Sequence, residues 1–216
     1  LVIKNLYDNS YIDEKKYKKL FNSEIKLRKR KKKYLEDARY YVEDVRKYLV
    51  EKYGFEKIYK QGFAIKTPIN LNLQSIATQS LRNGLISYDR RKGWRGSLTN
   101  LKNTTNWIDQ IKENKLEKSI GWDLAVIKKI NEREIEIEND KKLKGFIKFK
   151  ELEWIKKEPK NIFKTGDVIY VKKINGNQYS VQQLPKVNGG IVVMDPFTGR
   201  VLAMSGGFSF KKSEFN

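Results

Sequence analysis

Residues 122–149 read WDLAVIKKINEREIEIENDKKLKGFIKF, and this stretch decides the fold. Its middle segment, Glu134–Glu138, alternates glutamate with isoleucine, which is the period of a strand with one buried face. The flanking segments, Trp122–Ile130 and Leu143–Phe149, are rich in β-branched and aromatic residues, which favour strands. The Asn-Asp pair at 139–140 favours a turn before the third segment. We therefore expect three consecutive strands.

Two further strands are expected after a short helical insertion. Glu151–Lys156 resembles one or two helical turns, and the strands follow at Asp167–Ile174 and Tyr179–Leu184. The Asn-Gly-Asn sequence at 175–177 predicts a tight hairpin turn between them. Three strands, a helix and two strands is the order of the OB-fold, a five-stranded Greek-key barrel. A small open barrel of another topology is the alternative.

The part before the barrel is expected to be mostly helical. Asp13 can cap a short helix that carries Tyr17, Leu20 and Phe21 on one side. Apolar residues at spacings of three and four predict a second helix from about residue 34 to Gly54. A third helix should start at Asn70 and end at the Asn-Gly pair 83–84 or one turn later. Between them we expect one short strand at Gly62–Thr67, which Pro68 ends.

The part after the barrel is expected to be a hairpin, with strands at 190–194 and 201–204 around a turn at 195–199. Both strands are almost continuously apolar, which predicts burial on both faces in the centre of a larger sheet. The chain starts without Met and ends soon after this hairpin, so we expect an internal part of a longer protein.

Composition limits the possible chemistry. The 216 residues suffice for one ordinary domain or two small ones. The net charge is +20, but most of it is Lys scattered through the chain, and only residues 28–33 (RKRKKK) form a block. This favours a compositional bias, with a polyanion partner as the alternative. There is no Cys or His, which excludes disulfides and thiolate metal sites and removes the commonest general base. No apolar run approaches the length of a membrane span.

A family resemblance rests on several separate stretches. Residues 189–207, GGIVVMDPFTGRVLAMSGG, resemble the opening hairpin of the transpeptidase domain of class A high-molecular-weight penicillin-binding proteins. Residues 62–67 (GFAIKT), 70–74 (NLNLQ) and 81–85 (LRNGL) are similar to the strand and helix that precede that domain. Residues 88–96, YDRRKGWRG, are similar to the tract that leads into an inserted OB-like domain in some members.

The resemblance implies an α+β chain with three parts. Residues 1–90 would be a helical interdomain linker with the short strand Gly62–Thr67. Residues 91–187 would be the five-stranded OB-like β-barrel, and residues 188–216 the first β-hairpin of a truncated transpeptidase domain. The parent protein would be a bifunctional peptidoglycan synthase on the periplasmic side of the inner membrane, anchored by a transmembrane helix outside this sequence. Its glycosyltransferase would polymerise a lipid-linked precursor, and its transpeptidase would cross-link stem peptides through an acyl-serine that penicillins acylate.

The catalytic motifs of that transpeptidase are expected to be absent here. The reaction needs Ser-x-x-Lys, Ser-x-Asn and Lys-Thr-Gly. Partial matches occur at Ser23–Lys26, Ser209–Lys212 and Lys164–Gly166. The first lies in the helical linker, the second directly follows the hairpin, and the third precedes a barrel strand. We therefore expect no catalytic, cofactor-binding or metal-binding residue, and the nucleophile would lie beyond Asn216.

Two other chemistries compete with a structural role. The glutamates at 132, 134, 136 and 138 could serve acid–base catalysis or calcium binding, but alternation with isoleucine favours the solvent face of a strand. Trp94, Trp122, Tyr170 and Tyr179 could stack the bases of single-stranded nucleic acid, as in other OB-folds. We expect instead a non-catalytic segment that spaces two domains or docks a regulator. The resemblance implies a docking site for an envelope lipoprotein here, as in some relatives.

Overall fold

The computed structural model describes residues 2–23, 36–111 and 116–212. By its internal contacts the chain forms two units, residues 1–33 and 34–216, and each is described by itself. The predicted basic block at 28–33 lies outside the described residues, as does the start of the second predicted helix at residue 34.

The first unit is a pair of short helices, α1 (Val2–Asp8) and α2 (Glu14–Phe21). Asp13 caps α2, because its Oδ1 accepts a hydrogen bond from the Lys16 amide at 2.7 Å. The rings of Tyr7 and Tyr17 stack with their centroids 4.9 Å apart. The predicted cap and helix are therefore confirmed.

The second unit contains a closed five-stranded barrel. Its strands are β2 (Trp122–Ile130), β3 (Glu134–Asn139), β4 (Lys144–Lys148), β5 (Asp167–Asn175) and β6 (Gln178–Gln182). They pair in the order β5-β2-β3-β4-β6, and β6 pairs again with β5. The contact between β4 and β6 is parallel and the others are antiparallel. The strand order and the helical insertion, η4 (Phe149–Ile155) with α6 (Pro159–Ile162), confirm the predicted OB-like barrel.

The barrel has an inner and an outer layer of apolar side chains. Inward residues from all five strands form one core with η4 and Phe163; among the most buried are Ile127, Ile135, Ile137, Ile147, Val171 and Val181. On the outside, Leu124 and Val126 are covered by Trp107 of η2 (Trp107–Gln110). A two-residue strand, β1 (Thr99–Asn100), adds to β5 nearby. Strand β2 is therefore buried on both faces, which explains its nearly continuous apolar sequence.

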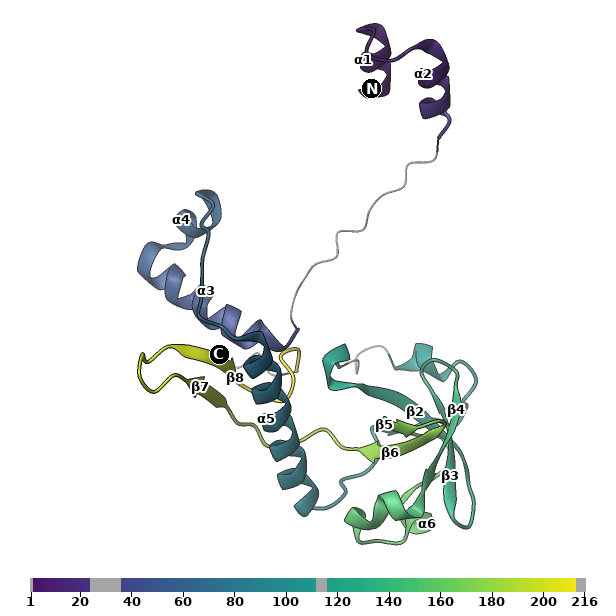
Figure 1. Ribbon diagram of the computed structural model, residues 1–216. Coiled ribbons are helices and arrows are strands. Elements are labelled where there is room, and N and C mark those ends of the chain that lie inside the picture. The colour runs from purple at the N-terminus through teal and green to yellow at the C-terminus, as the bar shows by residue number, and fades with distance from the viewer. Residues whose placement is uncertain (1, 24–35, 112–115, 213–216) are drawn as a thin grey trace. The chain divides into compact units, whose positions relative to one another are not determined.

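Helices and a hairpin make up the rest of the second unit. They are η1 (Glu36–Ala38), α3 (Arg39–Tyr53), α4 (Phe55–Lys60), α5 (Leu71–Arg91), η3 (Lys118–Ile120), β7 (Ile191–Met194) and β8 (Val201–Ser205). Helices α3 and α5 contact β8, and Figure 1 shows α5 running beside the hairpin. Gly54 ends α3 and Asn70 caps α5, as predicted. None of the described helices is both long and apolar enough to span a bilayer.

Two local predictions were wrong. Residues 63–70 form neither helix nor strand, and Phe63 and Ile65 of the predicted strand Gly62–Thr67 are 43% and 48% exposed. No other strand pairs with this segment among the described residues, so its alternating pattern does not produce a strand. Helix α5 continues through Gly84 to Arg91. Strand β7 pairs with β8, and its Val192 and Met194 are more than half exposed; burial of both faces within a larger sheet stays a prediction.

Candidate functional site: the buried face of helix α5

One face of α5 carries the contacts that hold the hairpin and the barrel. Residues at spacings of three and four lie on the same side of a helix. We call the set Gln74, Thr78, Arg82, Leu85 and Asp89 the α5 face. Gln74 and Asp89 are only 1% and 2% exposed. A 21-residue helix is about 30 Å long, so these two polar groups mark opposite ends of a rigid rod.

Asp89 fastens the barrel to the last turn of α5. Its Oδ1 accepts hydrogen bonds from Arg95 Nη1 at 2.8 Å and from the Lys186 amide at 3.1 Å, and its Oδ2 accepts one from Gln183 Nε2 at 2.8 Å. Arg95 also donates to the Leu184 carbonyl at 2.7 Å. Arg95 lies where the chain enters the barrel, and residues 183–186 lie where it leaves. One carboxylate therefore binds both the segment that enters the barrel and the segment that leaves it.

We call this contact between α5 and the barrel the Asp89 junction; it comprises Asp89, Arg95 and residues 183–186. Its hydrogen bonds determine the protonation state of Asp89. Burial would raise the pKa of Asp89, but the hydrogen bonds from Arg95, Gln183 and the Lys186 amide outweigh it and lower that pKa. Burial also lowers the pKa of the neighbouring Arg90. The Arg90 guanidinium donates to the Val181 carbonyl and lies 4.9 Å from the ring centroid of Trp154. The junction thus holds an ionised carboxylate at neutral pH.

Gln74 fastens the hairpin to the first turns of α5. Its Nε2 donates to the Met204 carbonyl at 2.9 Å, and its Oε1 accepts from the Met204 amide at 2.9 Å. The same Nε2 donates to the Asp37 carbonyl at 2.9 Å. The side-chain amide therefore takes the place of a neighbouring strand on the edge of β8. Two further hydrogen bonds hold β8: the Asn70 amide donates to the Leu202 carbonyl, and the Tyr41 hydroxyl donates to the Val201 carbonyl.

In both Ser-x-x-Lys matches the serine hydroxyl donates a hydrogen bond to an oxygen acceptor. The Ser23 hydroxyl donates to the Leu20 carbonyl at the end of α2, and residues 24–26 lie outside the described residues. Ser209 is 2% exposed, and its hydroxyl donates to Glu117 Oε2 at 2.6 Å. Lys212 is exposed, and its amide donates to the Ser209 carbonyl. Ser209 is thus bound to a carboxylate inside a domain contact.

The Lys-Thr-Gly match forms the turn into β5. The Lys164 amide donates to Asp167 Oδ2, and the Gly166 amide to the Ile127 carbonyl. Gly166 has φ +89°, and a side chain there would collide with the Leu101 carbonyl oxygen. The glycine is therefore required by the close approach of two backbone segments.

Replacing Gly166 with alanine should accordingly destabilise the barrel by about 2–3 kcal/mol, because a positive φ and a backbone collision both oppose it. Gly199→Ala at the hairpin turn is the control: its φ is +70°, but nothing lies within 4 Å of an added Cβ, so only about 1–2 kcal/mol is expected. Urea denaturation measures both. Equal losses in the two variants would contradict the collision.

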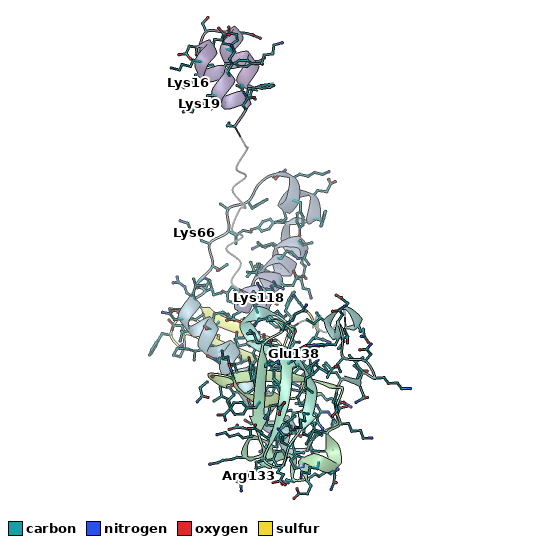
Figure 2. The ribbon with its side chains drawn as sticks, turned by 90° about the vertical axis from the view of Figure 1, so that its right-hand side faces the viewer. Lys16, Lys19, Lys66, Lys118, Arg133 and Glu138 are labelled. Carbon is teal, nitrogen blue, oxygen red and sulfur yellow. The ribbon has the colours of Figure 1, made fainter. Side chains whose placement is uncertain are left out.

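The alternating residues of β3 have structural roles. Ile135 and Ile137 are buried while Glu136 is exposed, as the alternation predicted. Glu138, labelled in Figure 2, lies 3.5 Å from Lys128 Nζ and accepts a hydrogen bond from Trp107 Nε1. Among the described residues, no three Asp or Glu side chains are grouped in a way that could hold a metal ion.

The aromatic residues proposed as base-stacking platforms pack inside the protein. Tyr170 and Tyr179 are 3% and 2% exposed. Trp94 packs against the rings of Trp154 and Phe163, and Trp122 against Tyr170 and Phe208. Nucleic-acid binding through these side chains is therefore not favoured.

Gln74, Arg82 and Asp89 lie in the stretches that carry the family resemblance, but the sequence alone assigned none of them a role. The signal that could have found them is their spacing, because each falls on the apolar stripe that carries Ala77, Leu81 and Leu85. A polar side chain on a buried stripe must find hydrogen-bond partners.

Comparisons with known proteins agree with this architecture. Residues 94–187 match the family described as penicillin-binding protein OB-like domain. The whole chain is 34% identical to penicillin-binding protein 1A of Rickettsia prowazekii (strain Madrid E) and 25% identical to that of Pseudomonas aeruginosa, and covers 28% of each. A crystal structure of penicillin-binding protein 1A from Haemophilus influenzae matches the whole chain with a TM-score of 0.74 at 25% identity, over 32% of its own length.

Proposed function

Since this chain belongs to the penicillin-binding protein family, of the 1A type, we propose that it joins the catalytic domains of a bifunctional peptidoglycan synthase. It spans 28% of the length of its curated relatives. In this proposal residues 1–90 are the interdomain linker, residues 91–187 the OB-like barrel and residues 188–216 the opening of the transpeptidase domain. The parent would act on the periplasmic side of the inner membrane on lipid-linked precursor and stem peptides.

The role of the segment itself is to hold the barrel at a fixed place relative to the transpeptidase opening. The observation that carries this proposal is the Asp89 junction. A domain tethered only by flexible linkers reorients freely, whereas the segments that enter and leave the barrel are both bound to one buried carboxylate here.

A domain held in this way can transmit the binding of a partner. The partner we propose is a cell-wall synthesis regulator such as an envelope lipoprotein. Calorimetric titration of the purified chain with candidate lipoproteins tests this; absence of heat with every candidate would count against docking.

We expect this chain to be non-catalytic. Incubated with a fluorescent penicillin and separated on a denaturing gel, the 216-residue chain should carry no covalent label, while the whole synthase should be labelled. A label on the chain that disappears in Ser209→Ala would overturn this expectation. An unlabelled whole synthase would overturn the transpeptidase proposal.

A further inference from the structure

A second buried carboxylate links the barrel to the segment that leaves the hairpin. Glu117 precedes η3 at the entrance to β2 and is 3% exposed. Its Oε2 accepts a hydrogen bond from the Ser209 hydroxyl at 2.6 Å, and its Oε1 accepts one from the Lys211 amide at 2.7 Å. Both oxygens of one barrel residue therefore hold the same turn, residues 208–212, which directly follows β8.

An apolar contact and an arginine complete this connection. Phe208 is 5% exposed and packs with Leu85 and Ile120, and its ring centroid lies 5.1 Å from that of Trp122 on β2. Arg82 of the α5 face donates from Nε to the Phe208 carbonyl at 3.0 Å and from Nη1 to the Ser119 hydroxyl at 3.3 Å. Residues of α5, the barrel and the post-hairpin turn thus form one contact, which we call the Glu117 latch.

The Glu117 latch couples the barrel to residues 208–212, because the ionised form of the Glu117 carboxylate depends on hydrogen-bond donors from that turn. Burial would raise the pKa of Glu117, but the hydrogen bonds from Ser209 and the Lys211 amide, with smaller help from Arg82, lower it. If the turn moved away, a buried ionised carboxylate would lose its donors. Such a loss is costly, so the position of the barrel and the position of residues 208–212 are energetically coupled.

We propose that Glu117 is a positioning residue for peptide cross-linking: through it the barrel sets the course of the chain that runs from β8 toward the transpeptidase nucleophile. This inference rests on the proposed function, in which the nucleophile lies beyond Asn216. It goes further by naming the contact through which a regulator bound to the barrel would affect the transpeptidase. That contact joins Glu117 to the Ser209 hydroxyl and the Lys211 amide.

The contact is tested first in the 216-residue chain. Glu117→Gln and Ser209→Ala should each speed hydrogen exchange of the amides in residues 208–212 by about 10-fold or more, because the turn opens locally. Ser209→Thr keeps the hydroxyl and should retain protection. Glu136→Gln, on the exposed face of β3, is the matched control. Unchanged exchange in both Glu117→Gln and Ser209→Ala would overturn the latch.

The consequence is tested in the whole synthase by the rate of acylation with a fluorescent penicillin. Glu117→Gln should slow acylation by about 10-fold, since small misplacements of reacting groups have effects of that order or larger. Its penicillin dissociation constant and its glycan polymerisation should stay unchanged, and Ser209→Thr should acylate like the wild type. If the wild-type synthase is not acylated, the proposed function fails. If it is acylated and Glu117→Gln reacts equally fast despite increased exchange at 208–212, the positioning role alone fails.

Discussion

Asp89→Ala is expected to lower the free energy of unfolding by about 3 kcal/mol, because removing one partner of a buried charged network leaves the others unpaired. Arg95 and Gln183 would each lose a hydrogen bond of 2.8 Å, and the Lys186 amide would lose its acceptor. Arg95 keeps some contact with solvent, which places the loss at the lower end of the range for buried pairs. Urea denaturation measures the effect.

Asp123→Ala is the matched control for this prediction. Asp123 also pairs with a cation, Lys141, at 2.7 Å, but the Lys141 side chain is 62% exposed. An exposed pair contributes at most about 1 kcal/mol. Equal losses for Asp89→Ala and Asp123→Ala would show that the junction contributes no more than a surface ion pair.

The same carboxylate makes stability depend on pH. The folded-state pKa of Asp89 lies below its unfolded value, so its contribution is present above the unfolded pKa of about 3.9. It is lost as the pH falls through the folded pKa. Glu117, whose pKa is also lowered, acts in the same direction. Acid unfolding of Asp89→Asn should therefore depend less on pH below about pH 4 than that of the wild type.

The orientation of the barrel should change with Asp89→Ala as well. The chain has no cysteine, so cysteines introduced at Asn83 and Ile174 would be the only sites for spin labels. In the wild-type background the distance distribution between the two labels should be narrow, and Asp89→Ala should broaden it. A distribution that stays narrow would contradict the spacing role, even if stability falls.

The strands of the barrel were predictable because the sequence signals for them are local. Period-two alternation and Asn-Gly turns act over a few residues, and β2 to β6 lie where they predict. The segment Gly62–Thr67 shows the limit of such patterns, because a strand also requires a partner. Helix α5 shows another limit: Gly84 costs about 1 kcal/mol in a helix, which the burial of Leu85 and the hydrogen bonds of Asp89 offset.

The polar contacts of the site could not be read from local patterns. Asp89 binds Gln183 across 94 positions, and Gln74 binds Met204 across 130. A single sequence gives the spacing of the α5 face but not which distant group each polar residue meets. The glutamate at 117 was passed over for the same reason, since its partners lie more than ninety residues away.

Gln74→Ala is expected to lower the free energy of unfolding by about 3 kcal/mol and to release the hairpin from α5. The substitution leaves the amide and carbonyl of Met204 and the carbonyl of Asp37 without the partners they have at 2.9 Å. Each buried group left unpaired costs about 1–3 kcal/mol. Gln74→Glu should be no better, because a carboxylate can accept from the Met204 amide but cannot donate to either carbonyl.

The control for Gln74→Ala lies on the same helix. Gln79 is exposed, so Gln79→Ala should change stability by less than about 0.5 kcal/mol. Urea denaturation gives the two free energies, and hydrogen exchange at the Met204 amide reports directly on the edge of β8. If Gln74→Ala matched Gln79→Ala in both measurements, α5 would hold the hairpin by apolar packing alone, and the helix would no longer fix the distance between hairpin and barrel through its polar ends.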